Sequence, residues 1–242
     1  NASKGVPDKQ FTDPDGVTHK LWCVSDEAFI ADLASKMADK KLYIADGHHR
    51  YETALRYKKF VAENKQDVGT SEYVTMMLVN MENSGLVVFP THRIVRDLEN
   101  FDVNAVIEKS KDYFDIETDL SRTDSTAKLD KAYKDGKKAF VLYCDGKYTL
   151  MTLKDTSLME KLMPTAIDKE NMANQKNLTY TRVLDEAIEA VDNGSADCSF
   201  ILNPTRVSEI RDVALAGEKM PQKSTYFYPK LTTGLVMNKI FN

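Results

Sequence analysis

Cysteine is scarce in this sequence, and no long hydrophobic run occurs. The three cysteines, Cys23, Cys144 and Cys198, are odd in number and far apart along the chain, which argues against a disulfide framework and favours a reducing compartment. No run approaches the roughly 18 apolar residues that a transmembrane helix needs. No stretch resembles a signal peptide either. We therefore expect a cytoplasmic protein that has no membrane partner.

An excess of basic residues is also missing. Lysine and arginine number 33 against 37 aspartate and glutamate residues, which gives a formal net charge of −4 and a pI near 5.7. A nucleic-acid-binding protein is expected to carry a basic face, so we expect no nucleic-acid partner, although a local basic groove stays open. The 242 residues, 42% hydrophobic and 29% charged, are typical of a globular protein with its own core.

The most informative stretch begins with the short apolar segment 42–45. It passes through Asp46 and Gly47 into a helical pattern that runs to about Asn64, which predicts a strand, a turn and a helix. We predict that Asp46 caps this helix and that Gly47 lets the backbone come close to a ligand. The free amides at the helix start favour an anion, and Arg50 adds a planar charge suited to phosphate or carboxylate.

Two other interpretations of this turn stay open. His48 and His49 stand in the first turn of the predicted helix, where paired histidines are often only a polar cap on a solvated end. A zinc site is the weaker alternative. Glu52 is spaced four and three residues from the two histidines, but there is no His-Glu-x-x-His pattern and no cysteine pair nearby. We therefore predict no zinc site at this turn and assign no residue to a metal site.

The remaining apolar patterns alternate between strand and helix. Asp145-Gly146 between two apolar stretches fits a type I′ turn, and 72–81 with 86–89 suggests a second hairpin. Because hairpins occur, we expect a mixed α/β fold with sheets that are partly antiparallel. The predicted strands are 18–24, 42–45, 72–81, 86–89, 91–95, 114–118, 139–143, 148–153, 178–181, 198–202 and 232–240. The predicted helices are 25–37, 48–64, 103–113, 124–134, 157–163, 183–191 and 203–217.

Two more segments are candidates for a site. His92 and Arg93 are adjacent in an extended stretch, so they point to opposite faces and at most one of them enters a given pocket. A hydrogen-bonded structural role for His92 is an equal alternative. The segment 220–230 is bounded by prolines and combines Lys223, Ser224 and Thr225 with three aromatic residues. It either lines the site or forms a surface loop that is unusually rich in aromatic residues.

Three motifs in this sequence resemble the bacterial family catalogued as domain of unknown function 1015. They are Ala-Asp-Gly-His-His-Arg-Tyr-Glu-Thr-Ala at 45–54, Pro-Thr-His-Arg at 90–93 and Met-Pro-Gln-Lys-Ser-Thr-Tyr-Phe-Tyr-Pro-Lys at 220–230. Within the first motif, Asp-Gly-His-His-Arg resembles the phosphate-contacting turn of the ParB and sulfiredoxin superfamily. That superfamily includes nucleotide-binding partition proteins, ATP-dependent sulfiredoxins and free-serine kinases.

The resemblance implies a mixed α/β (α+β) fold in two parts. Residues 16–98 are expected to form a ParB/sulfiredoxin-like phosphate-binding part, and residues 99–242 a second, mixed-sheet α/β part. Residues 1–15 are interpreted as a tail left from expression. Members of the resembled family are longer at the N-terminus, so we expect this chain to be a C-terminal fragment.

The first functional hypothesis is an enzyme that binds ATP or ADP with magnesium and transfers phosphoryl to a small hydroxyl metabolite such as serine. Phosphoryl transfer depends on charge neutralisation and positioning. We assign catalytic roles to Asp46, Glu52 and His49, with the two carboxylates as base or magnesium ligand. The predicted cofactor contacts are Gly47, His48, His49, Arg50, His92, Arg93, Lys223, Ser224 and Thr225.

The alternative hypothesis is a non-catalytic module that binds a nucleotide or another anion, as a ParB-like regulatory or DNA-associated protein would. ParB proteins carry a helix-turn-helix region after the phosphate-binding turn, whereas a β-pattern follows residue 64 here. The acidic pI also argues against DNA. The sequence predicts neither the oligomeric state nor whether turnover occurs.

Overall fold

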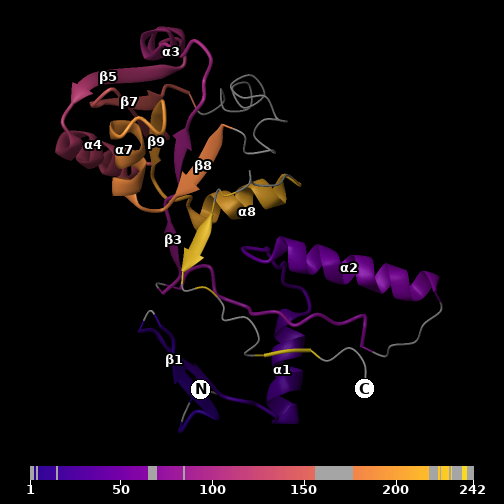
Figure 1. Ribbon diagram of the computed structural model, residues 1–242. Coiled ribbons are helices and arrows are strands. Elements are labelled where there is room, and N and C mark those ends of the chain that lie inside the picture. The colour runs from indigo at the N-terminus through magenta and orange to yellow at the C-terminus, as the bar shows by residue number, and fades with distance from the viewer. Residues whose placement is uncertain are drawn as a thin grey trace. The chain divides into compact units, whose positions relative to one another are not determined.

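The fold is mixed α/β, as predicted, and it divides into two units, residues 1–43 and residues 44–242. The computed structural model describes residues 3, 5–14, 16–64, 70–83, 85–155, 177–217, 223, 225–228, 230 and 236–238 (Figure 1). Each unit is described separately below. The ParB/sulfiredoxin-like character of part of the chain stays a prediction.

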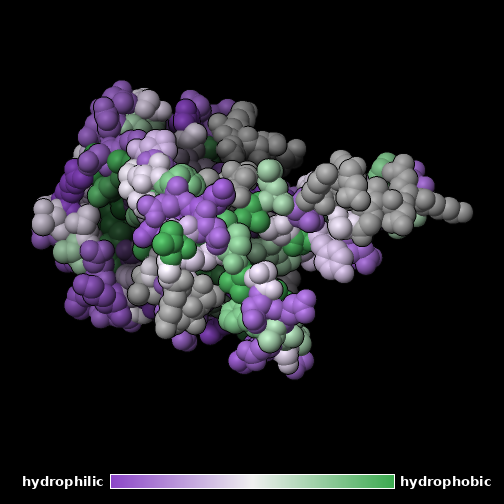
Figure 2. Space-filling view, turned by 90° about the horizontal axis from the view of Figure 1, so that it is seen from below, coloured by the Kyte–Doolittle hydropathy of each residue, from purple (hydrophilic) through white to green (hydrophobic). Residues whose placement is uncertain are grey.

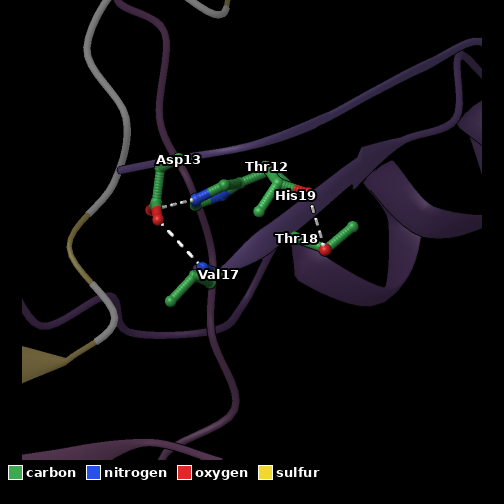
Figure 3. Close-up of polar contacts among 5 residues, drawn as sticks. All are labelled: Thr12, Asp13, Val17, Thr18 and His19. Carbon is green, nitrogen blue, oxygen red and sulfur yellow. Dashed lines mark hydrogen bonds and ion pairs between the residues drawn. The ribbon is translucent and has the colours of Figure 1, made fainter. Parts of the chain in front are cut away.

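The first unit opens with a hairpin of β1 (Lys9–Thr12) and β2 (Thr18–Leu21), which pair antiparallel. Asp13 holds the turn between them (Figure 3): its Oδ1 accepts a hydrogen bond from the Val17 amide at 2.9 Å, and its Oδ2 lies 2.8 Å from Nε2 of His19. The prediction of a tail up to residue 15 missed β1, because four residues of mixed polarity show little strand pattern by themselves.

Helix α1 (Glu27–Met37) follows in the same unit. It confirms the helix predicted at 25–37, and Asp26 caps it, because the Asp26 side chain accepts the backbone N–H of Phe29 at 2.6 Å. The expected apolar stripe is present, but it is not covered. Ile30 and Leu33 are 48% and 49% exposed, and none of the helix residues is buried.

The second unit begins with α2 (His48–Glu63), which confirms the helix predicted after the Asp-Gly turn. The strand predicted just before it is wrong, because residues 42–45 form no strand. The strand predicted at 72–81 is also wrong, since the described residues 70–83 contain turns and irregular backbone only. Apolar residues favour a strand only where a partner strand is available.

Strand β3 (Val87–Phe89) pairs antiparallel with β10 (Tyr226–Tyr228) and not with the preceding segment, so the hairpin predicted for 72–81 and 86–89 is wrong. Tyr226 lies opposite Phe89, and Tyr228 opposite Val87. The partner comes from the far end of the sequence, where no local pattern can point to it. This pairing brings the aromatic motif of residues 220–230 next to the Pro-Thr-His-Arg motif.

A six-stranded antiparallel sheet forms the main body of the second unit (Figure 1), in the order β5-β7-β6-β9-β4-β8. One of its strands, β4, precedes residue 98 and pairs with strands that follow it. The domain boundary at 98 stays a prediction. The strands are β4 (His92–Val95), β5 (Phe114–Leu120), β6 (Ala139–Cys144), β7 (Lys147–Leu153), β8 (Leu178–Thr181) and β9 (Cys198–Leu202).

Helices pack on both faces of this sheet. Residues of α4 (Arg122–Lys134) and α7 (Leu184–Asp192) complete one core cluster, and residues of α3 (Val103–Ser110) pack against the other. Helix α8 (Val207–Leu215) follows β9. The first cluster contains Leu129, Val141, Tyr143, Tyr148, Leu150, Ile188 and Ile201. The second contains Leu142, Cys144, Met151 and Cys198.

The turn between β6 and β7 agrees with the predicted type I′ hairpin. Asp145 and Gly146 both have positive φ, 50° and 74°, as this turn requires. Helix α8 begins later than predicted, at Val207, because the Glu209 carboxylate accepts the Arg206 backbone N–H and fixes the start there. The predicted helix 157–163 lies outside the described residues, as does most of the predicted strand 232–240.

Large hydrophobic side chains remain exposed away from the six-stranded sheet. They include Leu55 and Phe60 of α2, at 50% and 51%. Figure 2 shows such hydrophobic surface between hydrophilic residues in the view from below. The buried core is therefore concentrated in the sheet. None of the helices in the described part of the chain is long and apolar enough to cross a membrane.

Candidate functional site

Gly47 is the residue at which helix α2 begins, with φ at 83° and ψ at 24°. The predicted cap by Asp46 is wrong, because glycine itself occupies the capping position and no side chain caps the helix. Asp46 stands one residue too early in the chain for that role. The N–H groups of the first turn, which have no partner within a helix, are therefore left for another acceptor. An uncapped helix start favours an anion.

The guanidinium of Arg50 folds back over Gly47. A β-carbon placed on Gly47 would lie 2.9 Å from Nη2 and 3.2 Å from Cζ of Arg50. Glycine thus serves two purposes here, because it adopts the left-handed backbone conformation and leaves space for the guanidinium. The space beside Gly47 is taken up by Arg50, and the predicted close approach of a ligand to Gly47 stays a prediction.

Asp46 lies between two cations. Its Oδ2 is 3.8 Å from Nη2 of Arg50 and 3.5 Å from Nζ of Lys230. The carboxylate and the guanidinium are 50% and 58% exposed, so this is a solvated ion-pair network. Exposed ion pairs contribute only about 0–1 kcal/mol each, and a more highly charged anion can compete with them.

The other polar residues of the turn face solvent. His48 is exposed, and the His49 side chain is 97% exposed. Nδ1 of His49 lies 3.9 Å from Oε2 of Glu52, which is a loose contact. The catalytic roles assigned to Asp46, His49 and Glu52 stay predictions.

Lys230 connects the turn to a cluster of aromatic and basic side chains. Its Nζ lies 4.4 Å from the centre of the Tyr226 ring, and Cζ of Arg182 lies 4.1 Å from the centre of the same ring. Both distances suit cation–π attraction. Phe89 positions this ring from β3, with ring centres 6.3 Å apart. The contacts thus run from Asp46 through Lys230 and Tyr226 to Arg182.

The residues of the 220–230 motif that were predicted to contact a cofactor do not include Lys230. Lys223 is exposed and has positive φ, 57°, and Thr225 is half-buried. Ser224 lies outside the described residues. Lys230 stands in the same motif, and its position after the aromatic run was the only signal for it. Arg182 was missed because it follows a short strand and belongs to none of the three motifs.

His92 and Arg93 are separated by the alternation of β4. Nδ1 of the buried His92 accepts the backbone N–H of Leu202 at 3.1 Å, and burial lowers the pKa of this imidazole. That contact fits the alternative of a structural histidine. Arg93 is half-buried and lies opposite Tyr180 and Phe200 in the neighbouring strands. Burial lowers its pKa as well, whereas the charge of Tyr180 acts in the opposite direction.

His92 gives the sheet a pH dependence. Its folded pKa lies below the value of about 6.5 expected in the unfolded chain, so its contribution to stability is present above pH 6.5 and is lost as the pH falls through the folded pKa. We expect its share of the free energy of unfolding to fall by up to about 1.4 kcal/mol per pH unit below 6.5. Urea unfolding of the wild type and His92→Gln from pH 7.5 to 5 measures this, and equal slopes in the two proteins would contradict it.

Metal binding by this turn has little support in its geometry. The described residues hold no group of three or more histidine, cysteine, aspartate or glutamate side chains placed to bind a metal ion. Asp46, the predicted magnesium ligand, already lies against two cations. A carboxylate that is neutralised in this way fits magnesium poorly.

Comparisons with known proteins give a family but no named activity for it. Among solved structures, a conserved hypothetical protein from Pyrococcus furiosus aligns at 18% identity over 83% of this chain and 81% of that chain, with a TM-score of 0.47. Free serine kinase in complex with AMP aligns at 17% identity, and a mutant of it in complex with ADP at 16%. Both alignments cover 83% of this chain and 78% of the kinase, with TM-scores of 0.47 and 0.45.

No curated protein matches this chain. A family model described as "Protein of unknown function (DUF1015)" matches residues 1–187, which is more than half of the 242 residues. The chain therefore belongs to the DUF1015 family of proteins of unknown function.

Proposed function

We propose that the turn at residues 46–50 binds the phosphate groups of a nucleotide. The observation that carries this proposal is the guanidinium of Arg50, folded over Gly47 at the uncapped start of α2. Backbone amides and a planar guanidinium together provide the donors that a phosphate oxygen needs. Lys230 adds a second cation on the other side of Asp46.

The role of Asp46 in this proposal is to hold the two cations in place until the anion arrives. Its distances to Arg50 and Lys230, 3.8 and 3.5 Å, are longer than tight charge-assisted hydrogen bonds. A phosphate of higher charge then replaces a weak, solvated contact with stronger ones. Asp46→Asn keeps the shape and removes the competing charge, so it is a useful variant for raising phosphate affinity.

The reaction we propose is transfer of phosphoryl from ATP or ADP to a small hydroxyl metabolite such as serine. Arg50 and Lys230 neutralise phosphate charge, which is the main requirement of phosphoryl transfer. Glu52 and His49 lie within the first turns of α2 and supply the candidate base. Magnesium, where it takes part, is proposed to enter on the nucleotide phosphates, since the carboxylate of Asp46 is engaged.

A second candidate is a binding module without turnover. The high exposure of His49 and its loose contact with Glu52 favour it, because a catalytic base is normally oriented by firm neighbours. A regulatory or DNA-associated role in the manner of ParB proteins belongs to this candidate. Retention on DNA at moderate salt would support that role.

Thermal unfolding with added ligand tests the proposal. The probes are inorganic phosphate, AMP, ADP and ATP, each with and without magnesium and serine. At a concentration of about 100 times the dissociation constant, we expect a bound ligand to stabilise the fold by about 2.7 kcal/mol. Formation of phosphoserine from ATP or ADP then separates an enzyme from a binding module. Absence of any shift with all four probes would count against the nucleotide site.

A further inference from the structure

Arg93 and Arg182 are diagonal positions of the β4–β8 pair, and Arg182 also contacts Tyr226 of β10. Arg93 lies opposite Tyr180, and His92 opposite Thr181, so Arg182 follows as the diagonal neighbour of Arg93 at the end of β8. Strand β8 ends close to the start of β10 (Figure 1), in agreement with the contact of Arg182 and Tyr226. None of the three sequence motifs contains Arg182.

The charge at this place is not balanced by the described residues. Neither Arg93 nor Arg182 forms an ion pair with an acidic side chain in residues 3–155 or 177–238, as far as these ranges are described. Arg182 and Lys230 both form cation–π contacts with the Tyr226 ring. Arg182 is exposed, whereas the Arg93 guanidinium is half-buried and has lost part of its hydration, and an anion would restore favourable interactions for it.

We propose that Arg93 and Arg182 form a second anion subsite, which takes a phosphate or carboxylate group beside the Tyr226 ring. It extends the proposed function, because Tyr226 and Lys230 connect it to the turn at residues 46–50. The substrate class is then a ligand, or a pair of ligands, with two separate oxyanion groups. Guanidinium groups suit planar and tetrahedral oxyanions alike, and the Tyr226 ring lies against both Arg182 and Lys230.

Arg93→Met is the variant that tests this subsite. Methionine has a similar length and suits a half-buried position, so removal of an unbalanced charge should leave the ligand-free melting temperature unchanged or raise it. The same substitution should weaken oxyanion binding at least tenfold. Arg182→Met should also weaken binding, whereas Arg56→Met, at an exposed arginine of α2, serves as the matched control.

Titrations with inorganic phosphate and with acetate, followed by calorimetry, identify the oxyanion that the subsite takes. The anion whose affinity falls in Arg93→Met is the oxyanion group that the subsite binds. The measurement is repeated in an Arg50→Ala background, where the turn no longer contributes. Binding that remains in this background and is lost on adding Arg93→Met supports the subsite, even where the role of the turn fails.

Two results with Arg93→Met would overturn the inference, and a third comes from the comparison with Arg50→Ala. One is a fall in the ligand-free melting temperature of Arg93→Met with unchanged affinity for both anions, which would assign Arg93 to a structural ion pair. The other is a loss of anion affinity in Arg56→Met equal to that in Arg93→Met, which would show that only the net charge matters. Loss of binding in Arg50→Ala alone, with Arg93→Met unchanged, supports the proposed function and contradicts this extension of it.

Discussion

Arg50→Ala is expected to abolish nucleotide binding at the turn of residues 46–50 while the melting temperature stays nearly unchanged. The side chain is more than half exposed, and its contact with Asp46 is a weak surface pair, so the fold loses little. Binding loses the guanidinium that lies over the turn. Calorimetric titration with ADP and thermal unfolding of the same samples measure both quantities.

The conservative change Arg50→Lys should restore affinity only in part, because an ammonium group cannot reproduce the two-pronged contact of a guanidinium. Arg56→Ala controls for the loss of one positive charge on the same helix. A lower melting temperature of Arg50→Ala, combined with unchanged ADP affinity, would assign this arginine to a structural cap and end the phosphate hypothesis.

Leu142→Ala is expected to lower the free energy of unfolding by about 2–5 kcal/mol, the largest stability effect we predict. Leu142 is 1% exposed in β6, in the same cluster as Met151 and Cys198. The lost methyl and methylene groups leave a cavity that the neighbouring strands cannot close. Chemical denaturation followed by circular dichroism measures the difference.

Leu55→Ala is the matched control, since the same side chain is removed at a position that is 50% exposed in α2. We expect a change within about 0.5 kcal/mol, as for ordinary surface substitutions. Equal effects of the two changes would contradict the conclusion that the sheet holds the core, and would show that the apolar face of α2 is covered in solution.

Local chemistry was sufficient to predict the elements that local contacts hold. The helices predicted at 25–37 and 124–134 are α1 and α4, which Asp26 and Ser121 cap. Asp145-Gly146 forms the predicted hairpin turn, because few other residue pairs adopt positive φ twice in succession. The buried strands β6, β7 and β9 were also identified, since each is a short, largely apolar run between turn signals.

Contacts between residues far apart in the chain could not be predicted from local sequence patterns. The partner of β3 lies about 140 residues later along the chain, so the local pattern favoured a hairpin that does not form. Cys144 and Cys198, far apart in sequence, lie in one buried cluster, where burial raises the thiol pKa values to about 11 and 12. Their thiols therefore stay protonated at neutral pH.

In the candidate site, too, local features could be predicted from the sequence and long-range contacts could not. The turn with Gly47 and Arg50 could be identified from residue types, because its chemistry lies within five consecutive positions. The capping role predicted for Asp46 was wrong, because Gly47 occupies that position, and no local pattern could indicate the contact of Asp46 with Lys230 near the other end of the chain. Arg182 carried no signal in the sequence, because only the pairing of β4 with β8 makes it the diagonal neighbour of Arg93, and its contact with Tyr226 reaches a strand of another sheet.

A crystal structure of the protein with bound ADP tests the central claim most directly. We predict a phosphate group within hydrogen-bond distance of the Arg50 guanidinium and of the backbone amides of His48 and His49, with Lys230 turned from Asp46 toward the phosphate. ADP bound with its phosphates away from residues 46–50, and with the contact of Arg50 to Asp46 unchanged, would contradict the account.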